Sequence, residues 1–268
     1  MRPFAIPERV LVRSVSDAYA NCLRSDTTRA IDVVAARLQH EGYVAALRDL
    51  GIAVQLVPSA PSLPDACFIE DTAVVLAEVA IVTRPGAESR REEVLAVGEA
   101  LAPHRSVHVM EGPATLDGGD VLRAGDHVFV GLSTRTNAEG AAMLGRIAGA
   151  EGLALVTLEV RGGLHLKSAC TLANATTVVF DPAVIGVDEV RSFERAGLTC
   201  IEAEEPAGAN VLALGGTVLV SAAAPRTAAL LSAKCGAVRI LDVGEMHKGD
   251  GAMTCLSLRV AARGCWST

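Results

Sequence analysis

The sequence predicts an α/β ring of about five repeated units, each with a strand hairpin followed by a helix. Three observations predict it. Short apolar, β-branched runs recur roughly every 40–50 residues, a period typical of propellers and repeat arrays. A polar turn, a helix cap, an amphipathic segment and a terminal glycine follow most of these runs. Gly-containing turns inside the units indicate hairpins. An open α/β sandwich would fit the same period, so the repeats alone leave ring closure open.

An apolar run that indicates a buried strand defines each unit. These runs are residues 10–15, 80–83, 128–130, 177–180 and 218–220. In two units an earlier strand, at residues 72–76 and at 121–122, precedes the run. The sequences Ala-Gly-Asp at 124–126 and Leu-Gly-Gly at 214–216 predict hairpin turns, because glycine adopts the backbone conformations that tight turns need.

Helix-start and helix-stop residues follow the runs. Ser89 with Glu92, and Thr136 with Glu139, have the spacing of a capping box, and Asp188 is a further cap candidate. In the first unit, which fits less well, we expect a helix from about residue 28 to residue 50. The expected helix ends are Gly51, about Leu101, Gly197 and Gly236.

The composition is that of a globular protein with an aliphatic core. Hydrophobic residues make up 50% of the 268 residues, charged residues 21% and aromatic residues 3%. Few aromatic side chains, a net charge of −7 and short Lys/Arg clusters disfavour a nucleic-acid partner and are compatible with a small cationic ligand. Because no Pro-, Gly- or Ser-rich linker divides the chain, we expect a single domain over residues 1–268.

The chain has no segment that predicts secretion or membrane insertion. The first residues carry charge where a secretion signal needs an apolar run, and the most apolar stretch, residues 211–224, is short and contains glycines. The cysteines are Cys22, Cys67, Cys170, Cys200, Cys235, Cys255 and Cys265. Their odd number and the lack of a C-x-x-C motif predict a cytoplasmic protein, with neither a disulfide framework nor a zinc ribbon.

Acidic residues gather beside two predicted strands. Residues 63–71 include Asp65, Glu70 and Asp71, and the segment Thr-Leu-Asp-Gly-Gly-Asp-Val contains Asp117 between apolar residues and two glycines. Turn chemistry explains either segment by itself, since Asp and Gly are turn formers. Phosphate-binding, dinucleotide, zinc-protease and calcium-loop motifs are absent from the sequence, which leaves these carboxylates as the candidates for chemistry.

His165 and Cys255 complete a possible catalytic set. Each is unremarkable locally, because a lone His between leucines and a Cys in a strand-like pattern are commonly structural. Together with a carboxylate they form the combination of nucleophile, base and orienting group. A free thiol has a pKa of about 8.5, so a nearby imidazolium or bound cation would be needed to form thiolate. Arg90 and Arg135 lie near the starts of expected helices, where the helix dipole disfavours positive charge. A ligand carboxylate that bridges the two arginines would remove this conflict.

Six motifs together resemble those of the dimethylarginine dimethylaminohydrolases, a family of the guanidine-modifying (pentein) superfamily. They are L-P-D-A-C-F-I-E-D, T-R-P-G-A-E-S-R-R, A-T-L-D-G-G-D-V-L, V-G-L-S-T-R-T-N, G-L-H-L-K-S and D-G-A-M-T-C. The motifs occur in the family's order, and the resemblance as a whole extends from about Leu11 to Val260. The resemblance implies a five-bladed αβ propeller (pentein fold), in agreement with the repeats.

The resemblance also implies an activity, the hydrolysis of asymmetric dimethylarginine and monomethylarginine to citrulline and dimethylamine or methylamine. It implies Cys255 as the nucleophile that forms a thiouronium intermediate, His165 as general acid and base, and Asp117 as the group that orients His165. Some bacterial relatives have Glu in place of this Asp. We expect neither a cofactor nor a resident metal, although zinc could inhibit, and either a monomer or a homodimer.

Substrate contacts are implied for two carboxylate groups, two arginines and a mobile flap. Asp71 and Asp250 would hold the guanidinium with Asp65 and Glu70 nearby, Arg90 and Arg135 would bind the α-carboxylate, and Leu23 would belong to the flap. Gly249 ends residues 245–249, which depart from better-known members and would contact the α-amino group.

Two alternatives share the implied fold. Arginine deiminases and amidinotransferases use the same catalytic set, and two methyl groups discriminate weakly, since a methylene is worth about 1–3 kcal/mol in a pocket. The family resemblance implies that these classes have longer chains, which favours the hydrolase. A propeller that binds the ribosome as an anti-association factor would be non-enzymatic and would lack the Cys, His and Asp that this sequence contains.

Overall fold

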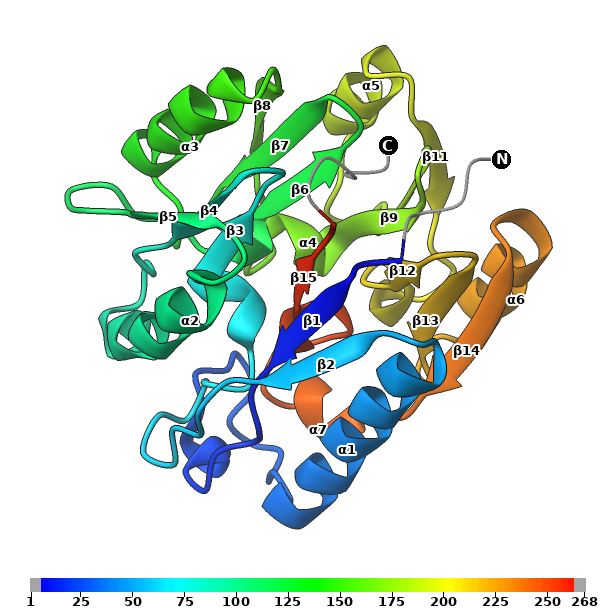
Figure 1. The fold of residues 1–268 in the computed structure, drawn as a ribbon. Helices are drawn as coiled ribbons and strands as arrows, with labels where there is room; N and C mark the ends of the chain where they lie inside the picture. Colours follow the sequence, from blue (N-terminus) through cyan, green and yellow to red (C-terminus); the bar gives the residue numbers. More distant parts are fainter. Residues whose placement is uncertain (1–5, 263–268) are drawn as a thin grey trace.

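The computed structural model describes residues 6–262. Within this range the strands form five three-stranded sheets around a common axis (Figure 1). In each sheet the middle strand pairs antiparallel with an inner strand and parallel with an outer strand. The repeated α/β architecture predicted from the sequence is therefore confirmed. Cys265 and the first residues of the chain, on which the secretion argument rested, lie outside the described range.

The middle strands coincide with the apolar runs that predicted them. They are β1 (Arg9–Val12), β4 (Val79–Val82), β7 (His127–Leu132), β10 (Thr177–Phe180) and β13 (Thr217–Ser221). The inner strands are β15 (Leu258–Val260), β3 (Ala73–Val75), β6 (Val121–Ala124), β9 (Cys170–Asn174) and β12 (Leu212–Leu214). Middle strands are largely buried on both faces, which is why they are continuously apolar.

The outer strands follow the helices and were not predicted. They are β2 (Ala53–Leu56), β5 (Ser106–Val109), β8 (Ala154–Glu159), β11 (Thr199–Glu202) and β14 (Ala237–Leu241). Their residues are mostly exposed or half-buried, so their sequences lack the continuous apolar run of the middle strands.

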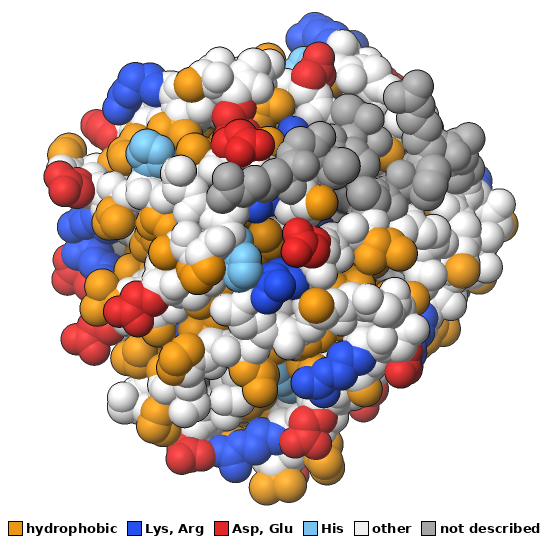
Figure 2. All heavy atoms as spheres, in the orientation of Figure 1, with side chains coloured by type: hydrophobic (Ala, Val, Ile, Leu, Met, Phe, Trp, Pro, Cys, Tyr) orange, Lys and Arg blue, Asp and Glu red, His pale blue; other side chains and the backbone are white. Residues whose placement is uncertain are grey.

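In each sheet an α-helix connects the middle strand to the outer strand, because two parallel strands need a crossover connection. These helices are α1 (Val33–Asp49), α2 (Val94–Leu101), α3 (Ala138–Ala150), α5 (Val187–Arg195) and α6 (Pro225–Lys234). Two shorter helices, α4 (Leu166–Ala169) and α7 (Gly244–His247), belong to loops. No helix within residues 6–262 combines the length and the apolar character needed to cross a lipid bilayer. Acidic and basic side chains are interspersed on the face that Figure 2 shows.

Several predicted helix starts were wrong. Helix α3 is capped by Asn137, whose side chain accepts the Gly140 N–H at 2.8 Å, because the Thr136 hydroxyl donates to Asp120 instead. Helix α5 follows Gly186, so Asp188 lies inside its first turn.

The predicted box of Ser89 and Glu92 lies within a 3-10 helix, η3 (Glu88–Glu93), and does not cap α2. Helix α1 starts later than expected, after Asp32, whose carboxylate accepts the Val34 and Ala35 N–H groups. The predicted ends at Gly51 and Gly197 fit, since both glycines have positive φ just after a helix.

A short helical turn precedes every inner strand, and this feature builds the site. These turns are η2 (Ile69–Thr72), η4 (Gly118–Asp120), α4, η5 (Pro206–Gly208) and η6 (Thr254–Leu256). Because the inner strands surround one axis, residues just before them converge at one end of that axis. Strand β15 pairs with β1, so the last strand of the described residues completes the first sheet.

Candidate active site

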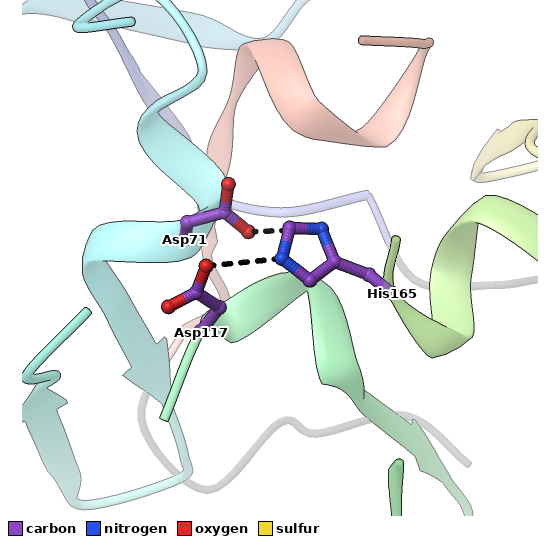
Figure 3. A group of neighbouring side chains, drawn as sticks. All are labelled: Asp71, Asp117 and His165. Carbon is purple, nitrogen blue, oxygen red and sulfur yellow. Dashed lines mark hydrogen bonds and ion pairs between the residues drawn. The ribbon is translucent and has the colours of Figure 1, made fainter. Parts of the chain in front are cut away.

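Three side chains from three consecutive turns meet at the end of the axis. Asp71 lies in η2, Asp117 just before η4 and His165 just before α4 (Figure 3). His165 Nε2 lies 3.0 Å from Asp117 Oδ2, and His165 Nδ1 lies 3.8 Å from Asp71 Oδ1. The repeat of the fold therefore assembles residues that are far apart in the sequence.

Asp117 is fully buried and its orientation is fixed. Its Oδ1 accepts the Gly86 N–H at 2.9 Å, which leaves Oδ2 for His165. A β-carbon at Gly86 would lie 2.4 Å from the Arg135 carbonyl oxygen, so only glycine allows this approach. The carboxylate thus binds Nε2 of His165, and Nδ1 is the ring nitrogen that remains for a ligand.

Asp71 is an ionised carboxylate with strong partners. Its Oδ1 accepts the Gly119 N–H at 2.9 Å and its Oδ2 accepts from Arg90 Nη1 at 2.5 Å. Burial raises the pKa of Asp71, but the charges of His165 and Arg90 and the hydrogen bonds from Arg90 and Gly119 lower it to about 2.

His165 is held as an imidazolium at neutral pH. Burial lowers its pKa, yet the charge of Asp71 and the hydrogen bond to Asp117 raise it to about 9, with help from the buried carboxylate of Asp120. A protonated imidazole beside a pocket can donate a proton to a leaving group.

Cys255 lies in the 3-10 helix η6 and not in a strand, which corrects the local prediction. It is half-buried and lines the same pocket as His165. Burial, followed by the charges of Glu70 and Asp71, raises the pKa of the Cys255 thiol to about 12. The raised pKa favours the neutral thiol at neutral pH.

Most of the predicted site residues line one pocket of about 20 Å³. Those residues are Leu23, Asp65, Asp71, Arg90, Arg135, His165, Gly249, Asp250 and Cys255. Phe68, Leu164 and Gly251 complete the lining. A second cavity of about 650 Å³ shares Cys255 and Arg135 with the first. Residues 162–164 and 206–207 are also part of its lining. The small pocket thus has a wider approach.

A loop around Leu23 closes the small pocket. The Leu23 N–H donates to both carboxylate oxygens of Asp65, at 3.1 and 3.3 Å. The Ser25 N–H and hydroxyl donate to the carboxylate of Asp250, at 2.5 and 2.9 Å. Asp250 has φ +57°, a conformation uncommon outside glycine, which aims its carboxylate at the loop. Asp65 and Asp250, both among the predicted substrate-binding residues, thus also hold this loop.

The two predicted arginines differ in burial and in their partners. Arg90 is buried, and its guanidinium donates to Asp71, to Glu93 and to the Phe68 carbonyl. Arg135 is less buried, and its Nη1 lies 3.8 Å from Asp117 Oδ2. Arg135 is therefore the guanidinium more open to a ligand.

Glu70 does not line the pocket that contains Cys255. Its carboxylate accepts from Lys167 Nζ at 2.5 Å and from Thr254 Oγ1 at 2.6 Å. It faces a separate cavity of about 110 Å³, which the inner strands line around the axis. The structure thus separates Glu70 from the other predicted substrate-binding residues.

Ligand atoms of Asp71, Asp117 and His165 lie within 4.8 Å of one another, close enough to hold a metal ion. The oxygens and nitrogen already share hydrogen bonds with Arg90, Gly86 and one another. Because the guanidinium groups of Arg90 and Arg135 lie beside them, the geometry favours a hydrogen-bonded triad over a metal-ion site.

Sequence reasoning missed several supporting residues. Asp120 accepts from the Ser133 and Thr136 hydroxyls and from the Leu166 N–H, and so ties the segment after His165 to η4. Phe68 packs against Gly251, where a β-carbon would lie 2.1 Å from the ring. The second Asp of the D-G-G-D segment was the available signal for Asp120, but turn chemistry explained it equally well.

Comparisons with known proteins agree with this geometry. The family model described as "N,N dimethylarginine dimethylhydrolase, eukaryotic" matches residues 7–256. An N(G),N(G)-dimethylarginine dimethylaminohydrolase of Streptomyces coelicolor is 40% identical over 94% of this chain and 97% of its own. The enzyme of that name from Pseudomonas aeruginosa is 30% identical over 94% of this chain and 99% of its own.

Solved structures show the same fold. A cysteine-to-serine variant of the Pseudomonas aeruginosa enzyme in complex with citrulline has a TM-score of 0.88 at 30% identity, covering 95% of this chain and 99% of its own. An amidinotransferase of saxitoxin biosynthesis from Microseira wollei shares the fold with a TM-score of 0.85 at 16% identity, covering 100% of this chain and 98% of its own. By sequence, by family model and by fold, the chain belongs to the dimethylarginine dimethylaminohydrolase family.

Proposed function

We propose that this protein hydrolyses Nω-methylated arginines, asymmetric dimethylarginine and monomethylarginine, to citrulline and dimethylamine or methylamine. The observation that carries the proposal is a shared pocket: Cys255 and His165 line it, and Asp117 holds His165. Membership of the family and its named relatives support the substrate class. We also propose that residues 1–268 act as one domain, in the reducing cytoplasm, without an added cofactor.

Substrate placement follows from the charges around the pocket. The cationic methylguanidinium would lie between Asp71 and Asp250, with its reacting carbon over Cys255. The α-carboxylate of the substrate would bind Arg135, and the positive charge of Arg90 in the same pocket would strengthen this contact. The Leu23 loop and the neighbouring Asp65 would cover the amino-acid end, where Gly249 offers backbone groups to the α-amine.

Substrate charge would activate the nucleophile. Without ligand, the Cys255 thiol has a raised pKa and His165 is already protonated. A guanidinium bound beside the sulfur favours thiolate, and the thiol proton leaves to solvent. The sulfur then adds to the guanidinium carbon and gives a tetrahedral adduct.

His165 serves both later steps. Its imidazolium donates the Nδ1 proton to the dimethylamino nitrogen, the C–N bond breaks, and dimethylamine leaves a thiouronium cation on Cys255. Neutral His165 then takes a proton from water as the oxygen adds to the same carbon. The C–S bond breaks, the thiolate returns and citrulline departs as its excess proton passes to solvent.

The test is citrulline release from asymmetric dimethylarginine compared with arginine. We expect faster turnover of the methylated substrate, with dimethylamine in equal amount, and no turnover by Cys255→Ser. The control is Cys200→Ser, because Cys200 is half-buried in β11 and does not line the pocket. A mass increase on Cys255 in His165→Gly would identify the thiouronium. Ammonia release from arginine as the main reaction would contradict the proposal and indicate an arginine deiminase.

A further inference from the structure

Thr254, the residue before the nucleophile, has its N–H and its hydroxyl bound by side chains from other units. Thr254 is buried, and its N–H donates to Asn210 Oδ1 at 3.0 Å. Its hydroxyl accepts from Asn210 Nδ2 at 3.1 Å and donates to Glu70 Oε2 at 2.6 Å. The main chain that enters Cys255 is thus held from two sides.

These contacts close into a ring through Lys167. Asn210 Nδ2 also donates to the Lys167 carbonyl at 2.9 Å, and Lys167 Nζ donates to Glu70 Oε1 at 2.5 Å. The four side chains are between 2% and 5% exposed. They come from segments before four different inner strands, and three of these segments also supply Asp71, His165 and Cys255.

None of these four residues lines the small pocket. Glu70, Lys167 and Thr254 line the cavity of about 110 Å³ around the axis, and Asn210 lines the cavity of about 650 Å³. A buried ion pair typically adds little to stability compared with apolar residues of the same volume. The burial of Glu70 and Lys167 therefore favours a role beyond stability, next to the sulfur.

The charges behind the nucleophile are opposed. Burial is the largest cause of the raised pKa of the Cys255 thiol. The charges of Glu70 and Asp71 raise this pKa further, and the charge of Lys167 lowers it. His165 lines the pocket on the substrate side. Glu70 and Lys167 thus act on the thiol with opposite signs. Arg259 Nη2, 3.6 Å from Glu70 Oε1, is a second cationic neighbour of this carboxylate.

We propose that Glu70, Lys167, Asn210 and Thr254 form a positioning network that holds the main chain of Cys255 for attack and balances the charge behind its sulfur. The role in attack rests on the proposed function, whereas the effect on the thiol does not. Glu70, expected from the sequence to contact substrate, acts in this network through Thr254.

The test of the charge balance needs no substrate. Cys255 is alkylated with iodoacetamide across pH 6–10, and peptide mass spectrometry separates it from the other cysteines. Glu70→Gln removes a negative charge and keeps an acceptor for Thr254, so we expect alkylation at pH 8 to rise about threefold or more. Lys167→Met should lower it by a similar factor, and the double variant should return close to the parent rate.

The test of positioning uses the hydrogen bonds. Asn210→Ala and Thr254→Val should lower kcat at least about tenfold and change KM less than about threefold, and Thr254→Ser should recover most of kcat. The control is Ser257→Ala, which removes a buried hydroxyl that contacts Tyr43 at 2.7 Å outside the network. We expect it to retain parent kcat.

The outcomes are distinguishable. Equal alkylation profiles in Glu70→Gln, Lys167→Met and parent, or shifts of the same sign, would overturn the charge balance. Failure of Thr254→Ser to exceed Thr254→Val in kcat would overturn the positioning role. If methylarginine is not a substrate but the alkylation profiles move in opposite directions, the proposed function fails and the effect on the thiol stands.

Discussion

Gly119 contacts His165 so closely that a β-carbon at position 119 would lie 2.7 Å from His165 Nδ1 and 2.6 Å from Asp71 Oδ1. Real β-carbons essentially never approach other atoms within 3.0 Å. Gly119 cannot retreat freely, because its N–H donates to Asp71. The second glycine of the D-G-G-D segment therefore fixes the distance between an imidazolium and a carboxylate.

Gly119→Ala should impair catalysis more than folding. The methyl group must displace His165 or Asp71 from the reacting atoms, and a displacement of about 1 Å can cost about 100-fold in rate. We expect kcat for dimethylarginine to fall by about that factor while the far-ultraviolet circular dichroism stays native. Gly149→Ala is the matched control, since nothing lies within 4 Å of a β-carbon there and we expect parent activity. Parent kcat in Gly119→Ala would contradict the close approach.

The raised pKa of His165 predicts a pH-dependent contribution to stability. The folded pKa is about 9, above the ordinary value of 6.5, so the contribution is complete below pH 6.5 and is lost as pH rises through 9. It amounts to at most about 3 kcal/mol, from 1.36 kcal/mol per pKa unit.

Urea unfolding of parent and His165→Gln between pH 5 and 9.5 measures this contribution. We expect the stability difference to be constant from pH 5 to 6 and to shrink between pH 6.5 and 9. The range stays above that in which Asp71, with a pKa of about 2, would protonate. His108→Gln is the control, because His108 is exposed. A difference that did not change with pH would mean that folding does not raise the pKa of His165.

The few aromatic residues should be important to stability. Phe129 and Phe193 are fully buried with ring centroids 4.8 Å apart in an edge arrangement between β7 and α5. Phe129→Leu removes this contact and leaves a void, so we expect a loss of about 1–3 kcal/mol in the free energy of unfolding. Val187→Ala, at an exposed position of α5, should cost less than about 0.5 kcal/mol. Equal urea midpoints for the two variants would contradict this.

The sequence predicted the parts of the fold that have a continuous apolar signal. The middle strands were predicted because burial on both faces makes runs such as residues 80–83 and 128–130 apolar. Outer strands such as β5, whose residues are exposed or half-buried, have no such run. Helix starts failed where a hydroxyl had a stronger tertiary partner, as Thr136 has in Asp120.

For the site, the sequence predicted residue types and the structure supplied their arrangement. Asp117 and His165 were paired by chemistry and resemblance, and they lie 3.0 Å apart. Local sequence could not separate Asp71 from the adjacent Glu70, although their carboxylates face different cavities. In a 3-10 turn neighbouring side chains point in different directions, and only the packed turns of the other units decide which one meets the substrate.

Arg135, more open to the pocket than Arg90, should determine affinity for the α-carboxylate. Arg135→Met removes a charged donor that lines both cavities around Cys255. A hydrogen bond to a charged group is worth about 1.5–3 kcal/mol, so we expect KM for dimethylarginine to rise about tenfold to hundredfold with a smaller change in kcat. Arg91→Met is the control, because Arg91 pairs with Glu88 outside the pocket.

A substrate without the α-carboxylate tests which group Arg135 binds. For an N,N-dimethyl-N′-alkylguanidine, parent and Arg135→Met should have similar kcat/KM, since the contact is absent in both. If Arg135→Met instead lowered kcat/KM equally for both substrates, Arg135 would act on the guanidinium or on Asp117, whose Oδ2 lies 3.8 Å from its Nη1. The two substrates thus separate carboxylate binding from an effect on the catalytic triad.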